Sequence, residues 1–391
     1  MGRPDEAVPE ARSRATAFQW DRVTRRVVLA GSLLAALTVL IGARDYAGDF
    51  RWGALLAAHQ ILAGQSPYPY TTSQAILAHP HAFVTPPLLA LIVVPLTVLP
   101  FAVAAGLWSL LSLAALVGAL RLLGVKDPRV IVLCACSYAA ALGIGDGQPD
   151  GILALVLAVA WRNRESWRGA IAVGVLIAAK LVAWPLVLWL LITRRALSAG
   201  IAVASAIVIL LSTWWVIGFD GFTAYPRILA TDLRVWGPPS YSIFAAFTRL
   251  GVGQDPARVV TIAAALAIAA AVIAAGRRTD LAIFVAAIVL GLLSSPMLRI
   301  SYLLPLLLAL AVSRQKLDSV WLLTCALYLT AAGLLPDGLA IAVALTMTIA
   351  IAVIAARPRV VVASVDTSFS PKSWLPVEAT ARRIGEGPPA G

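Results

Sequence analysis

TPPLLALIVVPLTVLP, residues 85–100, is the stretch on which the predicted fold depends. It is apolar enough for a membrane but holds four prolines, and proline removes a backbone donor and interrupts a helix. On either side of it, apolar runs recur from residue 27 to residue 356, and the whole chain is 60% hydrophobic and only 13% charged. Backbone that crosses lipid must be helical, because lipid satisfies no free backbone group. We therefore expect an all-α polytopic membrane protein.

Two topologies differ in whether residues 85–100 cross the membrane. If the segment stays outside as a re-entrant or interfacial helix, most of the 31 Lys and Arg residues fall on the cytoplasmic side; if it crosses, most fall outside. Membrane proteins retain Lys and Arg on the cytoplasmic side, which favours the first topology. It predicts a multi-pass plasma-membrane protein with about 12 transmembrane helices, a long first extracytoplasmic loop and both termini in the cytoplasm.

The composition divides the chain into three parts. Residues 1–26 and 357–391 are rich in polar and charged residues, and both are predicted to be disordered cytoplasmic tails. Residues 27–356 form the membrane-embedded domain. The net charge of +12 is explained by this topology rather than by nucleic-acid binding. The three cysteines lie in apolar runs, with the spacing of neither a disulfide framework nor a metal site, so no metal is expected.

Two aspartates follow the first apolar run, in GARDYAGDFRWG, residues 42–53. Asp45 and Asp49 are four residues apart, so on a helix they would share a face. They are either solvated carboxylates beside neighbouring arginines, or they include a general base that takes a proton from an attacking hydroxyl.

Further polar residues fall on the same predicted outer face. The turn GIGDGQPDG carries Asp146, Gln148 and Asp150. It is either an ordinary tight turn or a loop whose glycines let the backbone approach a ligand. Lys180 lies between apolar residues, where a charge is costly and usually functional, unless its side chain reaches the interface. Arg299 follows a Ser-Ser-Pro break, where it either meets lipid headgroups or binds a phosphate in a bidentate fork.

Several motifs occur in a fixed order over roughly residues 27–315. They are GDFRWGALLAAHQILAGQSPYPY, TPPLLALIVVPLTVLP, GDGQPDGILALVL, GVLIAAKLVAWPLVLWLLITRR, SYSIFAAFTRLG and SSPMLRISYLLPLL. In order and spacing the chain resembles the GT-C superfamily of glycosyltransferases. More closely, it resembles glycosyltransferase family 87, of the actinobacterial α-mannosyltransferase type.

The resemblance implies a fold, a reaction and a set of site residues. The fold would be a GT-C-type helical bundle, and the enzyme would move mannose from a polyprenyl-phosphate donor to a hydroxyl of a lipid or glycan acceptor, with inversion. Asp49 matches the family's catalytic acid and would be the general base. Lys180, Arg299 and Arg249 would bind the donor phosphate. The further substrate-binding candidates are Asp45, Tyr68, Asp146, Gln148, Asp150 and Tyr302. The lipid-linked sugar makes a nucleotide cofactor unnecessary, and no Rossmann fingerprint or P-loop is present. Neither a nucleic-acid partner nor a cofactor is expected, and membrane lipids would surround the bundle.

One departure from the family pattern leaves the sugar and the acceptor open. Mannosyltransferases of this type often carry a histidine shortly after the Ser-Pro, where this chain has Met297–Ser301. Two other classes of function also stay open: a transporter or flippase of a lipid-linked or anionic substrate, and a catalytically silent membrane scaffold. A transporter would need a polar path through the midplane, whereas here the polar residues gather on one predicted face.

Overall fold

The computed structural model describes residues 26, 30–31, 34, 46–331 and 334–357. Asp45 lies outside these residues, as do most of the first predicted span and, apart from Arg26 and Arg357, the two predicted tails. The described part of the chain is helical and contains no strand, which confirms the predicted all-α class.

The described chain up to residue 216 forms a series of mostly short helices. They are η2 (Asp49–Leu55), α2 (Leu56–Leu62), α3 (Ser73–Ala78), α4 (Leu88–Val93), η3 (Val94–Val98), α5 (Phe101–Leu122), α6 (Pro128–Ala135), α7 (Tyr138–Gly145), α8 (Asp150–Arg162), α9 (Trp167–Ala179), η4 (Leu181–Ala183), α10 (Leu186–Ile192) and α11 (Ala196–Val216).

The later part continues in the same way. Its helices are α12 (Tyr225–Trp236), α13 (Ile243–Arg249), α14 (Gln254–Ala275), α15 (Asp280–Ser294), η5 (Ile300–Leu303), α16 (Leu304–Ser313), η6 (Ser319–Trp321), α17 (Leu322–Ala326), η7 (Leu327–Thr330) and α18 (Asp337–Ala356).

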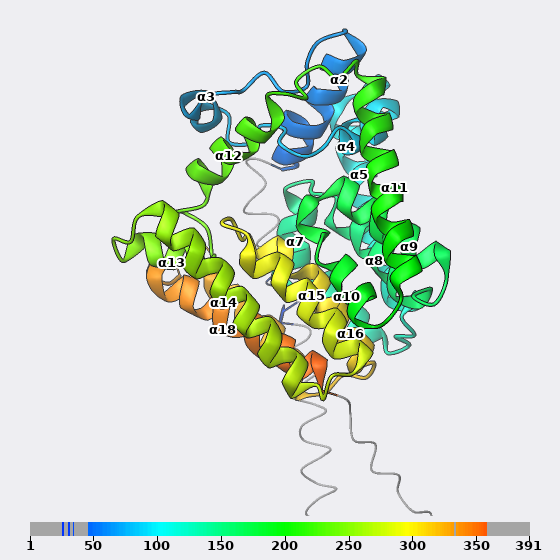
Figure 1. The fold of residues 1–391 in the computed structure, drawn as a ribbon, viewed down its shortest axis with the longest axis vertical. Helices are drawn as coiled ribbons and strands as arrows, with labels where there is room; N and C mark the ends of the chain where they lie inside the picture. The colour runs from blue at the N-terminus through cyan, green and yellow to red at the C-terminus, as the bar shows by residue number, and fades with distance from the viewer. Residues whose placement is uncertain (1–25, 27–29, 32–33, 35–45, 332–333, 358–391) are drawn as a thin grey trace, which may run out of the picture. The chain divides into compact units, whose positions relative to one another are not determined.

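Two groups of helices pack around a shared apolar core (Figure 1). In one group α5 packs on α8, α8 on α9, and α9 on α11; in the other α14 packs on α15, and both α15 and α16 pack on α18. The contact of α16 with α8 joins the groups. Small residues permit the close contacts: a Cβ at Gly151 of α8 would lie 2.2 Å from the backbone oxygen of Ser112 on α5.

Fewer helices than predicted have the length of a membrane span. Among the described residues, α5, α11, α14 and α18 are long and apolar enough to cross, and α6 with α7 makes a fifth if this pair, bent by 52°, is one span. The predicted count of about 12 is therefore not confirmed, because many apolar runs fold into helices shorter than about 17 residues. Residues 88–98 form one of these shorter apolar helices.

The antiparallel pair α8 and α9 separates two polar regions. Each has 13 residues and is therefore about 20 Å long. α8 begins at Asp150 and α9 ends beside Lys180, and these two side chains meet at one end of the pair. The turn of residues 163–166 lies at the other end.

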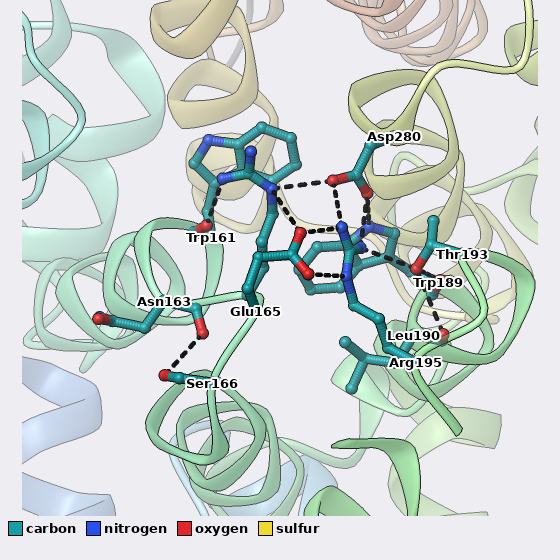
Figure 2. A network of polar contacts seen from close by, with 10 residues as sticks. Trp161, Asn163, Glu165, Ser166, Trp189, Leu190, Thr193, Arg195 and Asp280 are labelled. Atoms are coloured by element: carbon teal, nitrogen blue, oxygen red, sulfur yellow. Dashed lines mark hydrogen bonds and ion pairs between the residues drawn. The ribbon is translucent and has the colours of Figure 1, made fainter. Parts of the chain in front are cut away.

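Figure 2 shows the polar network at that second end, which ties together three stretches of chain. Asp280, the first residue of α15, accepts hydrogen bonds from Trp189 Nε1 at 2.7 Å and from Arg164 Nε at 2.9 Å. Arg195 donates to both Asp280 oxygens, at 3.0 and 2.9 Å, and also pairs with Glu165. The charges in this network therefore neutralise one another, leaving the opposite end to be considered for chemistry.

Candidate active site

The turn between α7 and α8 holds the backbone around Asp49 through hydrogen bonds. The backbone N–H of Asp49 donates to the Asp146 oxygen at 2.9 Å, and that of Ala47 donates to the Gly145 oxygen at 2.7 Å. Gly147 has φ +75°, and a Cβ there would lie 2.5 Å from the Cβ of Phe50. Only glycine fits this position without strain. Asp49 opens η2, a π-helical turn, and such turns are frequent at functional sites.

Three side chains from distant parts of the sequence hold the Asp49 carboxylate. His81 Nδ1 lies 2.5 Å from Asp49 Oδ1, Arg299 Nη1 lies 3.3 Å from Oδ2, and the Gln148 amide donates to Oδ2. Burial opposes ionisation of Asp49, but these hydrogen bonds and the positive charges outweigh it, and its pKa lies below the ordinary value. In turn the hydrogen bond to Asp49 raises the pKa of His81. The carboxylate is therefore ionised and held in place.

A second ion pair lies beside the first. Lys180 Nζ lies 2.5 Å from Oδ1 of the buried Asp150 and 3.5 Å from the Gln148 side-chain oxygen. It also lies 4.4 Å from the ring centroid of Tyr302, a distance at which a cation and an aromatic face attract. Gln148 thus bridges Asp49 and Lys180, so the two ion pairs form one polar cluster.

The cluster faces a pocket of about 710 Å³, a volume that includes space open to solvent. Its polar lining consists of Asp49, His81, Gln148, Lys180, Asp232 and Arg299. Phe83, Leu89 and Trp108 are among its apolar walls. Such a mixture of charged groups and apolar walls suits a ligand with both polar and apolar parts.

An apolar pocket of about 640 Å³ adjoins it. Lys180 and Tyr302 line both pockets, and leucines of α8 and α9, among them Leu157 and Leu176, line the apolar one. Lys180 therefore lies at the border between the polar pocket and the apolar pocket.

Three predicted site residues are not seen in this cluster. Two of them lie elsewhere in the structure, and the third lies outside the described residues. Arg249 Nη1 pairs with Asp337 Oδ2 at 2.9 Å and lines a different pocket. Tyr68 is buried, and its hydroxyl donates to the Thr85 backbone oxygen at 2.9 Å, so it packs beside the pocket instead of lining it. Asp45 lies outside the described residues.

Asp146 lies behind the pocket. Its backbone oxygen binds Asp49 N, and burial together with the nearby Asp49 charge raises the pKa of its carboxyl to about 6. Among the described residues, no group of three or more His, Cys, Asp or Glu side chains is placed to hold a metal ion.

Sequence reasoning missed two pocket residues, His81 and Asp232. His81 lies 32 residues beyond Asp49, in the predicted first extracytoplasmic loop, and Asp232 lies on α12. No linear spacing in the sequence relates either residue to Asp49.

The family profile of glycosyltransferase family 87 matches residues 83–301, more than half of the chain. The chain belongs to glycosyltransferase family 87. Its predicted family is thereby confirmed, and with it the coarse function of a membrane glycosyltransferase. The matched span includes Gln148, Lys180 and Arg299 of the polar cluster, whereas Asp49 and His81 precede it. No curated protein and no solved structure matches the chain.

Proposed function

We propose that this family 87 enzyme transfers a sugar, mannose, from a polyprenyl-phosphate donor to a hydroxyl of a lipid or glycan acceptor. The observation that carries the proposal is the polar cluster at the border of an apolar pocket. An ionised carboxylate, Asp49, lies within hydrogen-bond reach of Arg299, and one residue, Gln148, links it to Lys180.

The two adjoining pockets fit the two ends of a lipid-linked donor. The lipid chain would enter the apolar pocket and the surrounding lipid, which places its phosphate at Lys180 and Tyr302. Lys180 has three N–H donors; Asp150 and Gln148 each accept a hydrogen bond from it, which leaves one donor for a phosphate oxygen. Arg299 would bind a second phosphate oxygen, and in this arrangement the more distant Arg249 does not contact the donor.

The chemistry follows from this placement. Asp49 takes the proton of the acceptor hydroxyl as its oxygen attacks the anomeric carbon. The bond between that carbon and the phosphate oxygen breaks, and the leaving phosphate keeps the electron pair. Attack from the face opposite the phosphate inverts the anomeric carbon. Lys180 and Arg299 stabilise the charge that develops on the phosphate, so no metal or nucleotide is required.

The position of the basic turns relative to the pocket, at the opposite end of α8 and α9, supports a site on the extracytoplasmic face of the plasma membrane. The basic turns that we assign to the cytoplasm contain Arg164 and Arg195 and lie at one end, and the Asp49 pocket lies at the other. A transporter requires polar groups along the whole path, which this separation disfavours.

The experiment is a transfer assay with the full chain in nanodiscs and a cell-envelope lipid extract as acceptor. Labelled polyprenyl-phosphate mannose is compared with labelled polyprenyl-phosphate glucose and with nucleotide-linked mannose. We expect labelled glycolipid or glycan from the first donor alone. Transfer from the nucleotide-linked sugar would refute the lipid-phosphate donor, and preference for glucose would refute mannose.

A further inference from the structure

Asp232 differs from the other acids that line the pocket. It lies on α12, the residue is only 6% exposed, and it lines the polar pocket without pairing with a cation. Among the described residues it has neither a hydrogen-bond partner for its carboxylate nor an ion pair. Arg299, the cation whose charge acts on it, is bound to Asp49. Burial raises the pKa of Asp232 to about 6.

The Asp232 carboxylate is largely desolvated, but its oxygens are not among the fully buried side-chain atoms without a hydrogen-bond partner, so they face the cavity. Burying a polar group without a hydrogen bond is unfavourable, and burying a charge more so. Residues that cost stability in a ligand pocket are typically kept for function. The missing partner of Asp232 is therefore expected to come from a ligand that donates hydrogen bonds.

The position of Asp232 identifies which part of a substrate it meets. Lys180 and Tyr302 border the apolar pocket, whereas Asp232 lines only the polar one. α12 packs on α3, so Asp232 is supplied by the outer-loop helices instead of the bundle. Its charge adds to that of Asp49, and two carboxylates repel a phosphate and attract hydroxyl donors.

We propose that Asp232 binds the acceptor, that its carboxylate accepts hydrogen bonds from hydroxyl groups, and that it selects a neutral polyhydroxylated acceptor over an anionic one. The inference rests on the proposed function only in calling this ligand the acceptor. It assigns a specificity-determining role to a residue outside the cluster that holds Asp49.

The test measures binding without turnover. Hexyl α-mannoside serves as the neutral probe and its 6-phosphate as the anionic one, and saturation-transfer NMR gives the Kd for the full chain in nanodiscs. We compare the wild type with Asp232→Ala and with the isosteric Asp232→Asn. Asp220→Asn is the matched control, since Asp220 is an exposed acid of the same outer loop.

Both substitutions at position 232 remove a negatively charged hydrogen-bond acceptor from the pocket. Asp232→Ala weakens binding of the neutral probe roughly tenfold, the loss of one hydrogen bond to a charged group. Asp232→Asn narrows the preference for the neutral over the phosphorylated probe, and Asp220→Asn changes neither Kd. Both Asp232 variants keep or raise the Tm, because a buried unpaired charge is removed; a residue with a merely structural role would lower it.

Three results would overturn the proposal: no binding of the neutral probe by the wild type, equal binding by Asp232→Ala, or a Tm that falls in both Asp232 variants together with binding. Absence of transfer in the separate donor assay, with Asp232-dependent binding intact, would refute the proposed function and leave the binding role standing.

Discussion

Gly147→Ala tests how the turn before α8 positions the carboxylate of Asp49, the proposed general base. Gly147 has φ +75°, where an L side chain costs about 1–2 kcal/mol. The added Cβ would lie 2.5 Å from Phe50 Cβ, and ordinary contact begins at 3.4 Å. The turn and η2 must therefore separate by about 1 Å, and such overpacking costs about 1–3 kcal/mol more. Asp49 precedes Phe50, so it moves as well, and a misplacement of about 1 Å can lower a rate by about 100-fold.

The matched control is Gly64→Ala. Gly64 has φ +68° with nothing within 4 Å of its built Cβ, so this variant carries the backbone strain without the clash. Unfolding in detergent and transfer per folded molecule are measured for both variants. We expect Gly147→Ala to be less stable than the control by about 1–3 kcal/mol and to lose most of its transfer activity, whereas the control keeps its activity. Equal activity in the two variants would refute the claim that this turn positions Asp49.

Three further variants examine the site and its support. His81→Ala removes a hydrogen bond that lowers the pKa of Asp49, so this pKa rises and the acidic limb of the pH profile of kcat/KM moves to higher pH; an unmoved limb would contradict the coupling. Lys180→Ala raises the KM for the lipid-phosphate donor more than that for the acceptor, and equal changes in steady-state kinetics would argue against phosphate binding. Asp280→Asn disrupts the network with Arg195 at the opposite end and lowers stability by about 1.5–3 kcal/mol with transfer per folded molecule unchanged; a loss of transfer at unchanged Tm would refute this structural role.

Physical rules applied to the sequence predicted the helical class and some of the residues that gather. A charge in an apolar run is costly, so Lys180 was expected either to be functional or to reach the interface. In the structure its ammonium pairs with the buried Asp150. The glycine-rich turn was expected to be either an ordinary tight turn or a loop whose backbone approaches a ligand. It approaches the backbone of Phe50 and thereby places Gln148 on Asp49.

Other features depend on tertiary packing that no local pattern encodes. Hydropathy alone does not distinguish a spanning helix from a 13-residue apolar helix inside a bundle, which is why the predicted number of spans exceeds the number of long helices. Arg249 resembled a phosphate ligand by position, but α13 carries it to Asp337 instead. His81 and Asp232, which are far from Asp49 in the sequence, line the pocket only through tertiary packing.

The role of Asp49 as the general base is tested most directly by the transfer rate of Asp49→Asn. The rate is measured with polyprenyl-phosphate mannose beside wild type and Asp220→Asn. Asparagine keeps the shape of the side chain but cannot take the proton of an attacking hydroxyl. We expect no detectable transfer by Asp49→Asn, with normal expression and folding, and full transfer by Asp220→Asn, because Asp220 is exposed. Transfer by Asp49→Asn at the wild-type rate would contradict the assignment of Asp49 as the base and, with it, the proposed mechanism.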